Sequence, residues 1–203
     1  MSKIQSAKDL PKLGILGGTF DPIHNGHLIV AQDVMEKLNL AQVLFLLSAR
    51  PPHKNSAITA SWQDRLRMLK IALKGNPRFQ ASDIEIKRAG PSYTAETMDQ
   101  LKARYGSKYR ILFVMGADNI FDVFTWHEPE RLLASRSLVV VPRPGCDLRD
   151  LDPGVAEKVT LVQTPLIEIS SSQIRRRVRE GRSIKYLVPK EVATYIHRQH
   201  LYQ

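Results

Sequence analysis

The stretch LGILGGTFDPIHNGHLIVAQ, residues 13–32, joins an apolar run to a helical apolar period through a turn that contains glycine, proline and histidine. The apolar run 13–16 predicts a buried strand, and Gly17-Gly18 is expected to end it in a tight turn that a ligand can approach closely. Apolar residues recur at helical spacing from Leu28 to Leu38. A helix is therefore expected to begin near Asn25.

The same alternation of strand and helix patterns continues along the chain. Further strands are predicted at Val43–Leu47, Phe79–Ile86, Ile111–Met115, Leu138–Val141 and Thr160–Gln163. Further helices are predicted after the capping pair Ser61 and Asp64, at Thr94–Tyr105, at Ser171–Glu180 with Gly181 as its C′ residue, and from Pro189, as first helical residue, to about His200.

Alternating elements of this kind predict an α/β protein with a Rossmann-like open parallel sheet and helices on both faces. We expect residues 1–203 to form a single domain. Its more helical C-terminal part, from about residue 165 to residue 203, is predicted to be a small subdomain packed on the sheet. Ligands of such sheets bind beyond the carboxyl ends of the strands, where the opening stretch is placed.

The composition is that of a globular protein, with 43% hydrophobic and 25% charged residues among 203. No apolar run reaches the roughly 18 residues that a membrane helix needs. The N-terminal residues lack an apolar stretch of signal-peptide length, so a cytoplasmic protein is expected. Cys146 is the single cysteine, which excludes an intrachain disulfide and a cysteine-based zinc cluster.

The formal charge of +10 predicts an anionic partner. A nucleic-acid-binding protein is one alternative, because Arg175–Arg179 forms a basic run. However, aromatic residues are few at 7%, and the basic residues accompany serines instead of forming a stacking surface. We therefore expect small anions as partners, with neither nucleic acid nor membrane; a homo-oligomer is compatible with the sequence.

His24 and His27 flank Asn25-Gly26 at the expected start of a helix. The positive end of the helix dipole and the free backbone N–H groups there form an anion site, and both imidazoles can donate to a phosphate oxygen across the space that Gly26 keeps clear. A bound polyphosphate would favour their protonated forms. Half a metal site, a general base or two histidines without a ligand role remain alternatives. Neither G-x-G-x-x-G nor a P-loop sequence occurs.

A second stretch, EISSSQIRRR, repeats this arrangement near the C-terminal end. The hydroxyls of Ser170–Ser172 precede a helix, and Arg175–Arg177 follow within its first turns. Hydroxyls, helix-start N–H groups and arginine together can bind phosphate. A capped, solvated basic helix is the simpler interpretation of this stretch alone. A third basic element, Arg50–Lys54, follows the second predicted strand.

Two motifs resemble the signatures of the H-x-G-H nucleotidylyltransferase superfamily: His24-Asn25-Gly26-His27, and Ile169–Arg175 as I-S-S-x-x-I-R. Within it the chain is similar from end to end to the bacterial nicotinate-nucleotide adenylyltransferases, through the segments GGTFDPIHNGHL, PPHK, PSYTAETM, MGADN, TWHEPERLL and VPRPG. The resemblance implies that ATP and nicotinate mononucleotide, with Mg²⁺, give deamido-NAD and pyrophosphate. Nicotinamide mononucleotide and phosphopantetheine remain alternative acceptors.

The resemblance also implies roles for individual residues. His24, His27 and Arg175 would be catalytic, and no residue would bind a resident metal. The residues implied to contact ATP are Gly17, Gly18, Thr19, Phe20, His24, His27, Asp118, Ile169, Ser170, Ser171 and Arg175. Those implied to contact the mononucleotide are Lys54, Tyr93, Thr94, Asp118, Trp126 and Arg143.

Within this second set, Trp126 would stack on the pyridine ring, while backbone N–H groups near Thr94 and Trp126 face its carboxylate. His127 departs from relatives that have tyrosine there, which affects the details of the ring pocket.

Overall fold

The computed structural model describes residues 10–48, 58–88, 90 and 92–203. Its sheet has six parallel strands in the order β3-β2-β1-β4-β5-β6. They are β1 (Lys12–Gly18), β2 (Leu40–Leu47), β3 (Phe79–Ser82), β4 (Arg110–Gly116), β5 (Leu138–Val141) and β6 (Thr160–Leu161). The strand order reverses between β1 and β4, as in doubly wound nucleotide-binding folds. The predicted Rossmann-like parallel sheet is confirmed.

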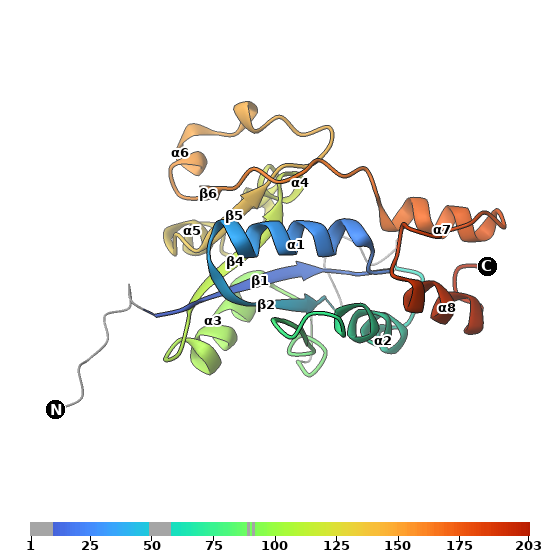
Figure 1. The fold of residues 1–203 in the computed structure, drawn as a ribbon. Helices are drawn as coiled ribbons and strands as arrows, with labels where there is room; N and C mark the ends of the chain where they lie inside the picture. Colours follow the sequence, from blue (N-terminus) through green and yellow to red (C-terminus); the bar gives the residue numbers. More distant parts are fainter. Residues whose placement is uncertain (1–9, 49–57, 89, 91) are drawn as a thin grey trace.

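Helices cover both faces of the sheet (Figure 1). The bounds are α1 (Asn25–Lys37), α2 (Trp62–Leu73), α3 (Thr94–Tyr105), α4 (Ala117–Ile120), α5 (Pro129–Ala134), α6 (Pro153–Ala156), α7 (Ser171–Arg179) and α8 (Lys190–Arg198), with 3₁₀ turns η2 (Val123–Thr125) and η3 (Leu148–Asp150). Alternate strand residues enter different cores: Leu16 packs with α1, α2, α7 and α8, and Ile15 packs with α3 to α6. The sheet is therefore the middle of three layers.

The first strand is longer than its apolar run predicts. Gly17 and Gly18 are the last two residues of β1, where they pair with Leu46 and Leu47 of β2, so the strand includes both glycines instead of ending before them. A Cβ at Gly17 would lie 3.0 Å from the ring of Phe113, and one at Gly18 would lie 2.9 Å from the ring of Phe20. The two glycines therefore make room for the rings of Phe113 and Phe20 at the end of the strand.

Two edge strands are shorter than predicted. β3 ends at Ser82 because its partner β2 ends at Leu47, and the next residues form a turn in which the carbonyl of Asp83 accepts the N–H of Ile86 at 3.0 Å. β6 ends at Leu161 because it pairs only with the short β5. At the last helix, Pro189 is the N-cap residue and not the first helical residue.

The C-terminal helices lie beyond the carboxyl ends of β1 and β2 (Figure 1), and α8 packs against α2. Ile174 of α7 and Ile196 of α8 belong to the core that also contains α1. Gly181 follows α7 with φ +63°, which confirms its predicted role as the C′ residue. In the described part of the chain, no helix is long and apolar enough to cross a membrane.

Candidate active site

The histidine turn lies at the carboxyl edge of the sheet, between the end of β1 and the start of α1. Asp118 lies just beyond the end of β4, and Arg143 lies just beyond the end of β5. The strand order reverses at this edge, between β1 and β4. Ligands of open parallel sheets bind in the crevice at such a position. The fold thus brings residues from three strand ends to one edge of the sheet, where such a crevice is expected.

His24 and His27 stack on each other, with ring centroids 3.6 Å apart and an interplanar angle of 25°. His24 is 2% exposed, and its extended backbone places it at the N-cap of α1. His27 is partly exposed and meets the ring of Phe20 edge-on at 5.1 Å. A Cβ at Gly26 would lie 3.1 Å from His24 Nδ1, which confirms that glycine keeps this space clear.

The helix start offers fewer backbone donors than predicted. The N–H of Asn25 donates to the carbonyl of Leu187 at 2.9 Å, and the N–H of His27 donates to the carbonyl of His24 at 3.0 Å. The amide of the Asn25 side chain donates to the carbonyl of Tyr186 at 2.7 Å. The prediction of free N–H groups is therefore wrong for these two residues, and an anion must rely more on the side chains.

The backbone N–H of His24 donates to His27 Nδ1 at 3.3 Å. A neutral imidazole accepts at one nitrogen and carries its proton on the other, so neutral His27 has its N–H at Nε2. His24 Nδ1 is buried and has no hydrogen-bond partner among the described residues. The local structure therefore fixes the tautomer of one ring and leaves a buried nitrogen of the other unsatisfied.

Both imidazoles are poor bases in this environment. Burial, followed by the positive charge of Arg143, lowers the pKa of His24 from 6.5 to about 3. Burial, then His24 and then Arg143, lower the pKa of His27 well below 6.5. Both rings are therefore neutral near pH 7, and each has one N–H to donate. The protonated pair expected with a bound polyphosphate requires the polyanion to offset both shifts.

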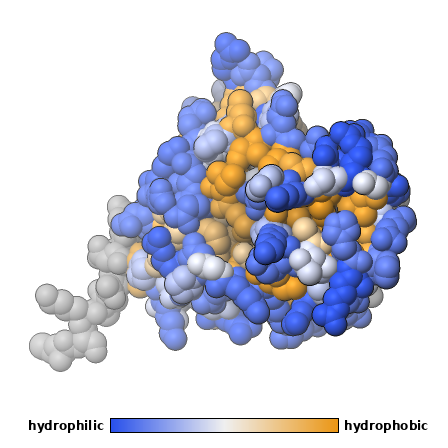
Figure 2. Space-filling model, turned by 45° about the vertical axis from the view of Figure 1, so that its right-hand side comes forward, coloured by the Kyte–Doolittle hydropathy of each residue, from blue (hydrophilic) through white to orange (hydrophobic). Residues whose placement is uncertain are grey.

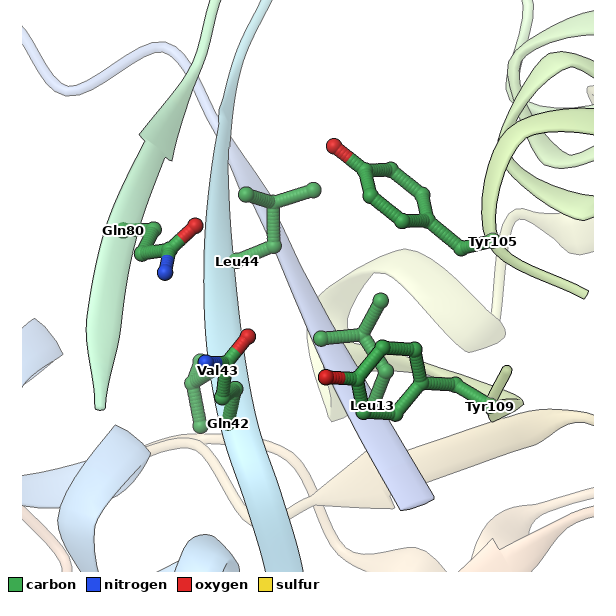
Figure 3. Close-up of a pocket in the computed structure, with 7 residues that line it drawn as sticks. All are labelled: Leu13, Gln42, Val43, Leu44, Gln80, Tyr105 and Tyr109. Carbon is green, nitrogen blue, oxygen red and sulfur yellow. The ribbon is translucent and has the colours of Figure 1, made fainter. Parts of the chain in front are cut away.

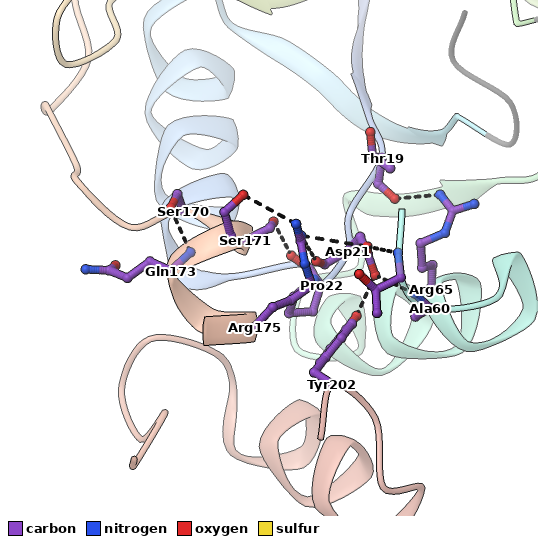
Figure 4. Close-up of polar contacts among 12 residues, drawn as sticks. Thr19, Asp21, Pro22, Ala60, Arg65, Ser170, Ser171, Gln173, Arg175 and Tyr202 are labelled. Carbon is purple, nitrogen blue, oxygen red and sulfur yellow. Dashed lines mark hydrogen bonds and ion pairs between the residues drawn. The ribbon is translucent and has the colours of Figure 1, made fainter. Parts of the chain in front are cut away.

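The serine-rich start of α7 contacts the histidine turn (Figure 4). Ser170 is the N-cap and accepts the N–H of Gln173 at 3.1 Å. Ser171 Oγ donates to the carbonyl of Pro22 at 2.8 Å, and Arg175 Nη1 donates to the carbonyl of Asp21 at 2.8 Å. The second motif thus contacts the turn that leads into His24, and its donors Ser171 and Arg175 hold that turn.

The carboxylate of Asp21 joins four segments, whereas the sequence around Asp21 indicates only a turn. It is 2% exposed and accepts the N–H groups of Thr59 at 2.8 Å and Ala60 at 3.2 Å and the hydroxyl of Tyr202 at 2.7 Å. The Arg175 guanidinium lies 3.7 Å from it. These partners are distant in sequence, so no local pattern could have indicated the cluster.

Arg65 is a second residue without a sequence signal. It is 2% exposed, and its Nη1 donates to the carbonyls of Thr19 and Ser48, each at 2.8 Å. It therefore connects the residues that follow β1 and β2. Phe20 is 2% exposed with φ +48°, and Ile169 packs against the core. Both residues therefore contribute to the core beside the turn.

Asp118 and Arg143 form an ion pair beyond the ends of β4 and β5, with 3.6 Å between Arg143 Nε and Asp118 Oδ1. The side chains are 47% and 37% exposed, so both remain accessible to a ligand. A Cβ at Gly116 would lie 2.8 Å from Arg143 Nε. Glycine at the end of β4 therefore leaves room for this pair.

A further group of predicted residues gathers at the start of α3. The rings of Tyr93 and His127 lie 4.5 Å apart at 30°, which brings the residues before Thr94 next to those after Trp126. Trp126 is partly buried against the core. The backbone N–H of Trp126 donates to the carbonyl of Val123 at 3.1 Å. A substrate carboxylate would therefore have to bind the N–H groups of neighbouring residues. Lys54 lies outside the described residues.

Two cavities involve other residues. A cavity of about 20 Å³, room for one water, lies at the amino ends of β1 and β2 (Figure 3), lined by Leu13, Gln42, Val43, Leu44, Gln80, Tyr105 and Tyr109. A groove of about 490 Å³ runs between α1 and the end of α2, and 44%-exposed Ile29 is among its lining residues. Figure 2 shows apolar side chains gathered on one face and ringed by hydrophilic ones. Of the predicted site residues that the structure describes, none lines either cavity.

The sequence model of a family described as cytidylyltransferase-like matches residues 15–177. This span contains both histidines, the Asp118–Arg143 pair and Arg175. The chain therefore belongs to this class of nucleotidyltransferases.

Closer relatives narrow the class. A probable nicotinate-nucleotide adenylyltransferase of Thermomicrobium roseum is 46% identical over 96% of this chain and 92% of the relative. A protein of the same name from Dehalococcoides mccartyi is 40% identical over 94% and 97%. The chain belongs to the family of nicotinate-nucleotide adenylyltransferases.

The solved structure of the Plasmodium falciparum nicotinic acid mononucleotide adenylyltransferase complexed with NaAD has the same fold. Its TM-score is 0.79 at 21% identity, covering 95% of this chain and 97% of that one.

Proposed function

We propose that this protein transfers the adenylyl group of ATP to nicotinate mononucleotide, which gives deamido-NAD and pyrophosphate for NAD biosynthesis. Relatives that are 40–46% identical and are named for this activity support the choice of substrates. The observation that carries the proposal is the stacked, neutral pair His24 and His27 at the carboxyl edge of the sheet, where the strand order reverses.

The reaction is a direct displacement. A phosphate oxygen of the mononucleotide attacks the α-phosphorus of ATP, the new P–O bond forms, and the bond to the bridging oxygen of the β-phosphate breaks. Pyrophosphate leaves with that electron pair. The attacking oxygen is largely ionised at neutral pH, because the second pKa of a phosphate monoester is about 6. The protein therefore needs no general base, and the low pKa values of the two histidines suit this role.

Catalysis then depends on positioning and on stabilising negative charge. Neutral His27 can donate its Nε2–H to a phosphate oxygen without first gaining a proton. Arg143 adds positive charge beside the pair, and Arg175 adds positive charge beside the turn that leads into His24. One preorganised donor aimed at developing charge is worth about 2.7–4 kcal/mol in the transition state. Holding two anionic substrates in line can supply about 7–11 kcal/mol more.

Mg²⁺ would enter as part of the substrate, bound to ATP. Among the described residues, no group of three or more His, Cys, Asp or Glu side chains could hold a metal ion. A Mg²⁺ ion that is held by phosphate oxygens and water, as is usual for this cation, does not need such a group. The residues of the crevice then act on the outer oxygens of the metal-bound triphosphate.

The acceptor would bind near Tyr93, Thr94, Trp126 and His127. The contact of Tyr93 with His127 gathers aromatic surface at the start of α3, where an aromatic ring can stack. The positive end of the α3 dipole favours an anionic group such as the carboxylate of nicotinate. This supports the acid over the amide as the acceptor.

A pyrophosphate-release assay with Mg²⁺ and ATP tests the proposal. Nicotinate mononucleotide, nicotinamide mononucleotide and phosphopantetheine are offered separately at equal concentrations. We expect the highest kcat/KM with nicotinate mononucleotide. A higher kcat/KM with either other acceptor would reject the substrate, and no release with any of the three would reject the reaction.

A further inference from the structure

The last residues of the chain reach the histidine turn. The hydroxyl of Tyr202 donates to Asp21 Oδ1 at 2.7 Å, although the two residues are 181 positions apart. Both side chains are buried, with exposed fractions of 5% for Tyr202 and 2% for Asp21. Figure 4 shows the phenol of Tyr202 reaching the carboxylate from a segment separate from the one that carries Arg175.

Three donors fix the orientation of this carboxylate. The N–H groups of Thr59 and Ala60 hold its two oxygens, and the Tyr202 hydroxyl holds Oδ1 a second time. Burial, followed by the charge of Asp21 and the hydrogen bond to it, raises the pKa of Tyr202 above its ordinary value. The phenol therefore stays protonated and remains a donor across the working pH range.

The backbone of Asp21 also binds the side chain of Arg175. Arg175 Nη1 donates to the Asp21 carbonyl at 2.8 Å and lies 3.7 Å from Asp21 Oδ2. The side chain of Arg175 is 13% exposed. Its burial and these two contacts together restrict the orientation of the guanidinium. The position of Asp21 thus decides where the guanidinium lies relative to the turn that leads into His24.

We propose that Tyr202 is a positioning residue for triphosphate binding: its hydroxyl fixes Asp21, and Asp21 fixes Arg175 and the turn that leads into His24. The inference rests on the proposed function in taking the polyanion in the crevice to be ATP. A phenol that is 181 residues away in sequence from its partner thereby couples the end of the chain to the nucleotide site. Loss of the hydroxyl leaves the ring packed and removes one of the three donors that orient the carboxylate.

The chain contains a matched control. Tyr195 of α8 also donates its hydroxyl to an aspartate, Asp64 Oδ1 of α2, at 2.9 Å. Neither Tyr195 nor Asp64 is among the residues of the crevice described above. Tyr202→Phe and Tyr195→Phe therefore each remove one phenol–carboxylate hydrogen bond that docks the C-terminal part. A merely structural role for Tyr202 predicts equal behaviour of the two variants.

The experiment measures thermal unfolding, binding of a non-hydrolysable ATP analogue by calorimetry, and steady-state kinetics. We expect both variants to be folded, and Tyr202→Phe to bind the analogue about tenfold more weakly, which is about 1.4 kcal/mol. Its KM for the mononucleotide should match wild type. Tyr195→Phe should match wild type for both ligands. Equal ATP affinity of Tyr202→Phe and Tyr195→Phe would overturn the inference.

A double-mutant cycle tests the route through arginine. If Tyr202 acts through Arg175, its removal should change ATP affinity less in an Arg175→Lys background than in wild type, because coupled residues are not additive. Full additivity would overturn that route. If Tyr202→Phe does not fold, Asp21→Asn replaces it in the test, because asparagine keeps the shape of the side chain. Asp21→Asn must then bind the ATP analogue more weakly while its KM for the mononucleotide is unchanged. Wild-type affinity for the analogue would overturn the inference. Binding of the ATP analogue is measured without an acceptor. The result therefore does not depend on whether nicotinate mononucleotide is the correct acceptor.

Discussion

Protonation of His24 should destabilise the fold in mild acid. Its pKa is about 3 in the folded chain and about 6.5 in the unfolded chain. Between these values the unfolded chain binds a proton that the folded chain does not bind. The free energy of unfolding therefore falls as the pH drops below about 6.5, by about 1.4 kcal/mol per pH unit. At about pH 5 the loss from this one group is about 2 kcal/mol. His27 contributes in the same direction.

Urea unfolding at about pH 7.5 and about pH 5 measures this loss. The comparison uses wild type, His24→Gln and, as a control, His197→Gln on the exposed face of α8. His24→Gln should lose about 2 kcal/mol less than wild type between the two pH values, because glutamine does not titrate. His197→Gln should follow wild type. If wild type and His24→Gln lose the same stability, His24 is not kept neutral by burial and the reasoning fails.

Three further substitutions test the site. His27→Asn keeps an acceptor for the His24 N–H but lacks a donor at the position of Nε2, so kcat should fall about 10²–10³-fold with the fold intact; an unchanged kcat contradicts this role. Trp126→Ala should raise KM for the mononucleotide and leave ATP affinity nearly unchanged, and an equal loss for both ligands would show that the ring pocket is misplaced. Gly26→Ala puts a methyl group 3.1 Å from His24 Nδ1, so kcat/KM for ATP should fall severalfold. Calorimetry should show no loss of thermal stability, because alanine favours a helix over glycine by up to about 1 kcal/mol. Wild-type activity of this variant would argue against a fixed position of the His24 ring.

The sequence predicted the elements better than their ends. Hydrophobic periodicity located the strands and helices because it reflects burial in a layered fold. The end of β1 was predicted too early, because Gly17 and Gly18 make room for neighbouring aromatic rings and belong to the strand. Such a tertiary contact has no local signature in the sequence. The edge strands β3 and β6 were predicted too long, since their lengths depend on where β2 and β5 end.

For the site, the two motifs indicated phosphate chemistry because histidine, serine and arginine at helix starts have few other common uses together. Their mutual contact, through Ser171 and Arg175 to the turn, needed the fold. The carboxylate of Asp21 and the guanidinium of Arg65 escaped prediction, because their partners come from segments far away in sequence.

A crystal structure with a non-hydrolysable ATP analogue and Mg²⁺ tests the central claim most directly. The account predicts a triphosphate oxygen within hydrogen-bond distance of His27 Nε2, with the phosphates lying beside the stacked rings and Arg175. A triphosphate bound at a distance from both imidazoles would contradict it.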